Sequence, residues 1–235
     1  CSGDDEPTPT DVRRAMHKVV RHCLYGVDIN PLSAELTKFS LWMESLEPGL
    51  PLAFLDSHIK VGNSLLGTTP ALLLKGIPDE AYKPLVGDDK KTANRLRKDN
   101  AAERAEQFDL LASQEDRAAV PVDTGTLARR TREVERMGVR SVSDIREQAR
   151  RHRLLLESPD RAVRKRVADA WCAAFVWPKH PDAPRAVTTA TLKIMAGDTE
   201  MAGMYPQAVP GEDTERELRR LTEQYSFFHW HLEFP

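Results

Sequence analysis

Residues 31–46 carry the most regular pattern of apolar and polar positions in the chain. Apolar side chains recur there at intervals of four, three, four and three residues, at Leu32, Leu36, Phe39, Met43 and Leu46. This spacing places them on one face of an α-helix, and we expect that face to be buried. Asn30 is a suitable N-cap and Pro31 suits the first helical position, whereas Glu47-Pro48-Gly49 is expected to end the helix.

Short apolar runs flank this helix and predict two strands. The first covers residues 23–27, and the second covers residues 58–61, just before Gly62-Asn63. Between the helix and the second strand, residues 50–55 are expected to cross back over the core. A strand, a helix and a strand of these lengths are typical of a parallel crossover unit, which is right-handed in nearly all sheets. A helix over about residues 11–22, capped by Thr10, is expected before this unit.

Beyond residue 68 the pattern predicts helices. Charged residues and alanine dominate residues 88–170, where apolar positions are too sparse for a deep core. One long or broken helix contains Leu96, Phe108, Leu110 and Leu111, and another contains Val142, Ile145, Ala149 and Leu154 to Leu156. A more buried helix covers residues 162–176, and two more lie near 188–196 and 213–226. We therefore expect a core over residues 1–75, a mainly helical insertion over 76–222, and a segment over 223–235 that leads back to the core.

Composition narrows the function classes only slightly. The formal charge is −2, from 34 basic and 36 acidic residues, so the charge of the whole chain does not indicate nucleic-acid binding. No apolar run approaches the roughly 20 residues of a membrane span, and we expect a cytoplasmic protein. The 3 cysteines and 7 histidines lack metal-ligand spacing, so we expect no metal site. The chain begins without Met and stops on an aromatic run, which favours an internal piece of a longer protein.

Asp28 is the first residue that could carry chemistry. It follows the first predicted strand, and the carboxyl ends of parallel strands open onto the ligand crevice of such sheets. A carboxylate there can accept hydrogen bonds from both hydroxyls of a ribose, and its charge strengthens each bond. Ile29 would then lie against one face of an adenine. Helix capping by Asp28 explains the same pattern about equally well.

Gly62 and Asn63 follow the second predicted strand. A glycine allows the backbone to approach a flat ligand closely, and an asparagine amide can match the donor and acceptor on an adenine edge. The structural alternative is an ordinary turn, because Gly-Asn is a common turn dipeptide. The two motifs lie one crossover apart, and together they are less ordinary than either is separately.

Two further patterns have a structural interpretation that we prefer. In the closing segment, aromatic residues alternate with polar ones, namely Phe228, Trp230 and Phe234 with His229, His231 and Glu233. This alternation predicts an extended segment with a buried aromatic face. The functional alternatives are a platform for a flipped base and a histidine pair for acid–base chemistry. Basic clusters, among them Lys90-Lys91, Arg95 to Lys98, Arg150 to Arg153 and Arg161 to Arg166, are interleaved with acidic residues. They are typical of solvated helix faces with internal ion pairs. The sequence holds neither a P-loop nor a G-x-G-x-x-G motif.

Several of these segments together resemble a known family. They are Tyr25 to Pro31, Ala34 to Leu36, Ser40 to Trp42, Pro51 to Asp56, His58 to Gly67 and the closing Phe228 to Pro235. The chain is thereby similar to adenine-specific DNA methyltransferases, namely the large ones of type IIG restriction–modification systems and the PglX-like methylases of phage defence. The likeness is dense over about residues 20–75 and the last ten residues. It is loose across the middle.

The resemblance implies a partial class I methyltransferase fold, an α/β Rossmann-like parallel sheet with a large helical insertion. It implies S-adenosylmethionine as cofactor, with Asp28 as the ribose ligand, Ile29 as the apolar contact to adenine, and Gly62 and Asn63 beside the adenine amino group. Many relatives have Asp where this chain has Asn63, which keeps an acceptor and loses the charge. The implied partners are double-stranded DNA and further subunits of a defence system.

Two family motifs are absent from the sequence. One is the glycine-rich motif of the Asp-Pro-x-Cys-Gly-Ser-Gly kind, and the other is the catalytic Asn-Pro-Pro-aromatic motif, since the single Asn-Pro here is Asn30-Pro31. We therefore expect methylation of adenine N6 in DNA from the intact parent protein, and none from these residues by themselves. Two alternatives stay open. One is a degenerate methyltransferase-like scaffold, and the other is a nicotinamide-dependent α/β enzyme, which also places an acidic residue after its second strand.

Overall fold

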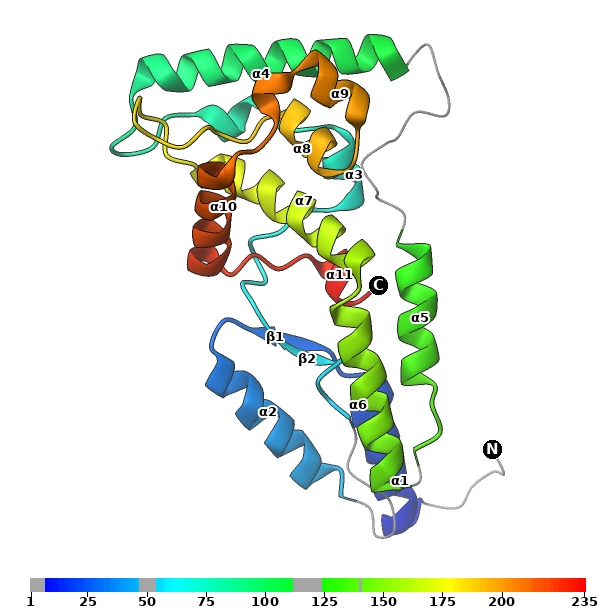
Figure 1. Ribbon diagram of the computed structural model, residues 1–235. Helices are drawn as coiled ribbons and strands as arrows, with labels where there is room; N and C mark the ends of the chain where they lie inside the picture. Colours follow the sequence, from blue (N-terminus) through cyan, green and yellow to red (C-terminus); the bar gives the residue numbers. More distant parts are fainter. Residues whose placement is uncertain (1–6, 47–53, 112–123, 140) are drawn as a thin grey trace. The chain divides into compact units, whose positions relative to one another are not determined.

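The computed structural model describes residues 7–46, 54–111, 124–139 and 141–235, with only the backbone for residues 106–111 (Figure 1). The described residues are mainly helical and include a two-stranded parallel sheet, which is compatible with the predicted α/β class. They divide into two compact units. The first unit comprises the described residues up to Asn63, then Thr126–Glu157 and Phe234, and the second comprises those within Ser64–Gly125, Ser158–Glu233 and Pro235. The predicted boundaries at residues 75 and 222 stay a prediction.

The first unit is built around a short parallel strand pair. Its elements are α1 (Pro9–His22), β1 (Gly26–Asp28), α2 (Pro31–Glu44), β2 (Ile59–Val61), α5 (Gly125–Glu135, from its second residue) and α6 (Val142–Leu156). In the sheet, Gly26 pairs with Ile59 and Asp28 pairs with Val61, in parallel register. The predicted order of strand, helix and parallel strand is confirmed, with strands of three residues each (Figure 1).

Helix starts in this unit follow local capping chemistry. Asn30 caps α2, since its side chain accepts a hydrogen bond from the Leu32 N–H at 2.9 Å and Pro31 occupies the first position, as predicted. The predicted cap of α1 at Thr10 is wrong. Thr8 caps that helix, and the side chain of Asp11, three residues later, accepts a bond from the Thr8 backbone. The predicted end of α2 at residues 47–49, and residues 50–53 of the predicted crossing, lie outside the described residues.

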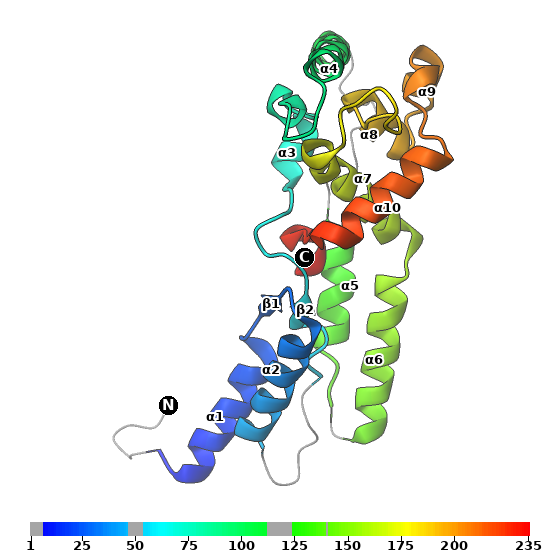
Figure 2. The same ribbon diagram turned by 90° about the vertical axis from the view of Figure 1, so that its left-hand side faces the viewer.

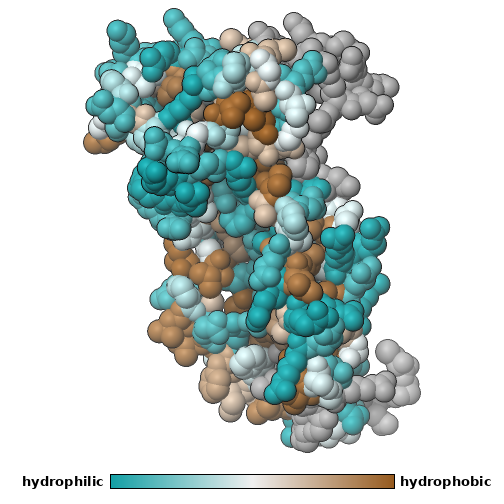
Figure 3. Space-filling model, viewed as in Figure 1, coloured by the Kyte–Doolittle hydropathy of each residue, from teal (hydrophilic) through white to brown (hydrophobic). Residues whose placement is uncertain are grey.

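The buried face predicted for α2 is the wrong face. Leu32 is 65% exposed and Phe39 is 57% exposed, and Leu36, Met43 and Leu46 are exposed as well. The helix instead buries Ala34 and Lys38 and packs Leu41 and Trp42 against a small core of Val20 and Leu55. In Figure 3, apolar side chains accordingly gather over α2. The physical reason is that α2 carries two apolar faces, and the described residues of this unit cover only one.

Helices α5 and α6 complete the first unit. The Gln148 side chain on α6 donates to the carbonyl oxygen of Val134 on α5 at 3.0 Å, and both residues are buried. Arg21 on α1 donates to the carbonyl oxygen of Met137, just after α5, at 2.9 Å. The helix predicted to contain Val142 and Leu154 is confirmed as α6, and both of these side chains are exposed. Polar side chains that satisfy backbone carbonyls therefore help to hold this unit together.

The second unit is helical throughout its described residues. Its elements are α3 (Pro70–Leu74), η1 (Asp79–Tyr82), α4 (Lys90–Leu111), α7 (Pro159–Val176), α8 (Thr189–Met195), α9 (Thr199–Met204), η2 (Pro206–Ala208), α10 (Glu212–Tyr225) and α11 (Trp230–Glu233). The predicted helices near 162–176, 188–196 and 213–226 are confirmed. Helix α7 packs against α8 and α10 and is the most buried of them, as expected (Figure 2). The long helix predicted to contain Leu96 is confirmed as α4, and Leu96 is half-buried there. The side chains of Phe108, Leu110 and Leu111 lie outside the described residues.

Asn100 on α4 is the polar centre of this unit. It is fully buried, its carboxamide oxygen accepts from the backbone N–H of Thr189 at 2.9 Å, and its amide donates to the Ile77 carbonyl at 2.8 Å. The Tyr82 hydroxyl donates to the Val187 carbonyl at 2.8 Å beside it. These bonds tie α4 to η1 and to the start of α8, and they satisfy backbone groups that would otherwise be buried without partners.

The closing segment of the chain packs against residues 64–69. The Phe228 N–H donates to the Leu66 carbonyl at 2.8 Å, and a Cβ added to Gly67 would lie 2.0 Å from the Phe228 carbonyl oxygen. The predicted extended segment with a buried aromatic face is wrong beyond Phe228. Residues Trp230–Glu233 form the short helix α11, in which Trp230 is 48% exposed. A helix does not preserve the two-residue alternation that the prediction assumed.

Candidate functional site

The predicted site residues of the first unit meet at one end of its sheet. The ladder between β1 and β2 continues past Val61, where the Gly62 N–H donates to the Asp28 carbonyl at 2.9 Å. Asp28 and Ile29 therefore leave β1 at the point where Gly62 and Asn63 leave β2. These are the carboxyl ends of two parallel strands, which is where ligands bind in open α/β sheets.

The Asp28 carboxylate is exposed and has a fixed orientation. Its Oδ1 atom accepts the Asn30 N–H at 2.7 Å, in a local turn between β1 and α2. Asn30, rather than Asp28, is the N-cap of α2. The capping role, which explained the position of Asp28 equally well from the sequence, therefore belongs to Asn30. The solvent-facing side of the Asp28 carboxylate can accept further hydrogen bonds.

The neighbours of Asp28 suit a flat nucleoside. Ile29 is 58% exposed, an unusual environment for an isoleucine at the end of a strand. Gly62 is buried and contributes no side chain, and Asn63 is half-buried. A carboxylate for ribose hydroxyls, an exposed apolar side chain for a base and an amide for the base edge are the groups that adenosine requires. The residues present therefore fit the adenosine part of S-adenosylmethionine.

His229, near the end of the chain, is structural rather than catalytic in its geometry. His229 is 1% exposed, its Nε2 lies 2.9 Å from Asp169 Oδ1, and its Nδ1 lies 3.2 Å from the Thr68 N–H. Since Nδ1 must accept from that N–H, Nε2 carries the proton and donates it to Asp169. Both ring nitrogens are occupied, so His229 anchors the closing segment to α7. Burial lowers the pKa of the neighbouring His231, which favours its neutral form.

Internal ion pairs account for several of the basic clusters, as the sequence predicted. Arg150 and Arg151 both donate to Glu147, and these bonds lower the pKa of that carboxyl to about 2. On α7, Arg164 pairs with Asp160 at 3.0 Å. The cluster on α4 behaves differently, because Arg95 makes no salt bridge within the described part of the chain.

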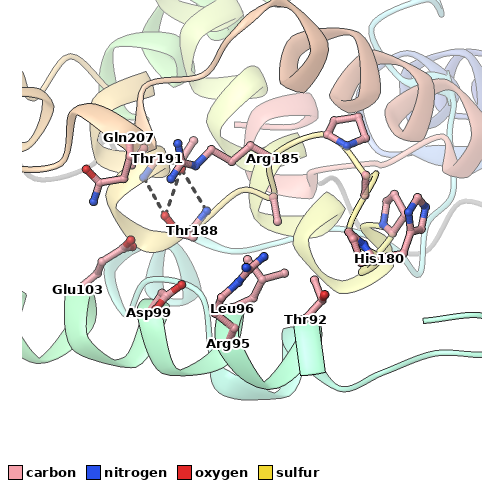
Figure 4. Close-up of a pocket in the computed structure, with 16 residues that line it drawn as sticks. Thr92, Arg95, Leu96, Asp99, Glu103, His180, Arg185, Thr188, Thr191 and Gln207 are labelled. Carbon is pink, nitrogen blue, oxygen red and sulfur yellow. Dashed lines mark hydrogen bonds between the residues drawn. The ribbon is translucent and has the colours of Figure 1, made fainter. Parts of the chain in front are cut away.

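A cavity in the second unit was not foreseen from the sequence. It measures about 540 Å³ and lies between α4 and residues 178–191. Figure 4 shows Arg95 and Asp99 projecting from α4 on one side and Arg185 and Thr188 on the opposite wall. The prolines at 178, 181 and 184 mark the loop that forms this wall, but nothing in their spacing indicates a hollow.

Neither a metal-binding cluster nor a membrane-spanning helix is found among the described residues. They contain no group of three or more His, Cys, Asp or Glu side chains placed to hold a metal ion. None of their helices combines the length and the apolar character that a membrane crossing requires.

Comparisons with known proteins do not identify a family for the chain. No family model matches it, and no curated protein or solved structure is significantly similar to it.

Proposed function

We propose that the chain supplies the adenosine-binding part of a methyltransferase that transfers a methyl group from S-adenosylmethionine to adenine N6 in DNA. The observation that carries the proposal is the bond from the Gly62 N–H to the Asp28 carbonyl, which brings both motifs to one edge of a parallel sheet. The resemblance of residues 20–75 to adenine-specific DNA methyltransferases, with a class I methyltransferase fold and a place in restriction–modification or phage defence, supports the same proposal.

Each residue of the site has a distinct role in this proposal. The Asp28 carboxylate accepts hydrogen bonds from the ribose hydroxyls, and its bond from the Asn30 N–H holds it in place before the ligand arrives. Ile29 covers one face of the adenine and excludes water from it. Gly62 leaves room for the base, and the Asn63 amide receives its edge. When bound, the sulfonium of the cofactor supplies the methyl group, whereas these residues bind and orient the adenosine.

A titration with S-adenosylmethionine tests the proposal directly. Calorimetry on the full chain should detect saturable binding, with competition by S-adenosylhomocysteine and none by guanosine. Asp28→Asn keeps an acceptor for the Asn30 N–H but loses the charge, and we expect the affinity to fall about tenfold or more, as for a charge-assisted bidentate contact.

A matched control separates the site from general charge effects. Glu44→Gln removes the exposed carboxylate of a residue on α2 whose side chain makes no hydrogen bond or ion pair in the described residues, and should leave the affinity unchanged. Absence of binding, or equal affinity of the wild type and Asp28→Asn, would contradict the proposal. The first of these results would favour the degenerate scaffold. Competition by NADH would favour the nicotinamide-dependent enzyme.

A further inference from the structure

The cavity in the second unit has a cationic rim. Lys91, Arg95 and Lys98 lie at intervals of four and three residues, so they share one face of α4, and all three are exposed. They line a hollow that adjoins the 540 Å³ cavity, since Thr92, Arg95, Asp99 and Pro181 line both. Arg185 lies on the wall of the 540 Å³ cavity opposite α4 (Figure 4). Four cationic side chains thus line two adjoining hollows.

These cations differ from the other basic clusters in forming no salt bridge, although the charge of Lys91 acts on Asp89 and that of Arg185 acts on Glu103. Among the described residues, neither Lys91, Arg95, Lys98 nor Arg185 forms a salt bridge. By contrast, Arg216 and Arg220 on α10 pair with Asp213 and Glu217 at 2.9 and 2.6 Å. Ion pairing within a helix is the usual state of such clusters. Its absence on α4 leaves the side chains of Arg95 and Lys98 available for an external anion.

Most carboxylates near this surface are already engaged. Asp88 accepts from the Lys179 N–H at 2.9 Å, and Asp89 accepts from the Thr92 N–H at 2.7 Å at the start of α4. Glu103 is buried and accepts from the Ala190 N–H at 2.9 Å. Asp99 is the exposed acidic residue that remains on the rim. Hydrogen bonds from Thr92 lower the pKa of Asp89, which therefore stays charged, so both Asp89 and Asp99 are expected to oppose an anionic ligand.

The wall opposite α4 is held rigidly. The Asp89 N–H donates to the Lys179 carbonyl at 2.8 Å, and the Trp177 indole donates to the Pro184 carbonyl at 3.0 Å. Trp177 and Lys179 are both buried, with 1% and 0% exposure. A surface fixed in this way loses little conformational freedom when it binds a ligand.

We propose that this surface, defined by Lys91, Arg95, Lys98 and Arg185, binds the phosphodiester backbone of double-stranded DNA. Unpaired Lys and Arg side chains on a preorganised surface are the groups that neutralise backbone phosphates. The choice of DNA as the polyanion rests on the proposed function, whereas the phosphate-binding residues are assigned from their geometry. The surface positions DNA without reading its sequence, because phosphate contacts carry no base information.

Fluorescence anisotropy with a short labelled duplex tests this assignment. We expect the full chain to bind the duplex, and Arg95→Ala/Lys98→Ala to weaken binding about tenfold at low salt. The slope of log Kd against log salt concentration should fall by about 2, one for each phosphate that the variant no longer neutralises. Asp99→Asn should tighten binding about threefold, because it removes a like charge from beside the phosphates. A gain of affinity cannot arise from misfolding.

The control is a second double variant with the same change in net charge. Arg216→Ala/Arg220→Ala removes two arginines of the same unit that are already paired, and should change the affinity by less than about twofold. Equal effects of the two double variants would overturn the assignment, and so would no binding of the duplex by the wild type. Displacement of the duplex by millimolar inorganic phosphate at constant ionic strength would also overturn it, in favour of a small phosphorylated ligand.

The cofactor titration keeps the two proposals separable. Arg95→Ala/Lys98→Ala should leave the affinity for S-adenosylmethionine unchanged, and Asp28→Asn should leave the affinity for the duplex unchanged. DNA binding without cofactor binding would contradict only the proposed function. Cofactor binding without DNA binding would contradict only the surface on α4.

Discussion

The Gly62 N–H donates to the carbonyl oxygen of Asp28 at 2.9 Å, across the ends of two three-residue strands. This bond extends the ladder by one step beyond the strands themselves. It fixes the distance between two motifs that lie more than thirty residues apart in the sequence. The chain therefore brings a carboxylate and a glycine–asparagine pair together with very little sheet.

Gly67 should tolerate no side chain. A Cβ at this position would lie 2.0 Å from the Phe228 carbonyl oxygen, so Gly67→Ala must push the closing segment away from residues 64–69. We expect a decrease of about 2 kcal/mol or more in the free energy of unfolding, measured with urea. Gly203→Ala on α9 is the control, because nothing lies within 4 Å of its added Cβ. It should be neutral or slightly stabilising, and equal destabilisation of the two variants would refute the close approach.

Asn100 should be far more sensitive to truncation than its exposed neighbour Asn94. Asn100→Ala leaves the backbone N–H and the hydroxyl of Thr189 buried without their shared acceptor. We expect this to cost about 3 kcal/mol of unfolding free energy, the sum of two unsatisfied groups. Asn94→Ala changes the same residue type on the same helix at an exposed position, and should cost less than about 0.5 kcal/mol. A thermal or urea unfolding series on the two variants measures the difference.

His58 should make the stability depend on pH. Burial lowers the pKa of His58 to about 4, helped by the nearby charges of His22 and Lys60, and its Nδ1 has no hydrogen-bond partner in the described residues. The unfolded chain, with the ordinary pKa of 6.5, binds a proton that the folded chain excludes. Stability therefore falls as the pH drops from 6.5 towards 4, by about 3 kcal/mol when complete.

Replacement of His58 isolates its share of this pH dependence. Burial raises the pKa of the neighbouring Glu135, so this carboxyl makes the stability fall as the pH rises. Glu135 is present in both the wild type and the variant. His58→Phe keeps a ring for the edge contact with Tyr25 at 4.5 Å and removes the titration. Urea unfolding between pH 5 and 7, values that bracket the ordinary histidine pKa, should show a flatter profile for the variant. Parallel profiles would exclude His58 as the source.

The two described cysteines should differ in reactivity. Cys23 is exposed, whereas burial raises the pKa of the Cys172 thiol to about 12. A thiol reacts through its thiolate, so Cys172 should resist a disulfide reagent at pH 8 until the second unit unfolds. In a Cys1→Ser/Cys23→Ser variant, labelling should be absent in buffer and complete in denaturant. Rapid labelling in buffer would show that α7 is more open than its burial indicates.

Local chemistry explains which features could be predicted from the sequence. The caps and the Asn30-Pro31 start of α2 depend on neighbours within four residues, as do the bounds of α8 and α10. The true cap of α1 was also within reach, because Thr8 and Asp11 form a capping box around Pro9. The parallel pairing of β1 with β2 followed from the strand–helix–strand pattern.

Long-range contacts explain the failures. The closing segment turns into α11 while His229 is bound to Asp169, sixty residues earlier, and no local pattern encodes that pair. The face that α2 buries depends on its neighbours, and the face with Ala34 is buried in place of a longer apolar stripe because α2 packs against the sheet. The cavity beside α4 depends on a loop some eighty residues away. Such features can be identified only in the folded chain.

The exposed apolar stripe of α2 has a calorimetric consequence. Leu32, Leu36, Phe39 and Met43 are each more than half exposed, so the water around them contributes to the heat capacity of the folded protein. Any binding event that covers this stripe must release that water and lower the heat capacity. Binding enthalpies measured at several temperatures would then show a steep negative slope. Ligands held by Asp28 or by the cations of α4 should give a much shallower one.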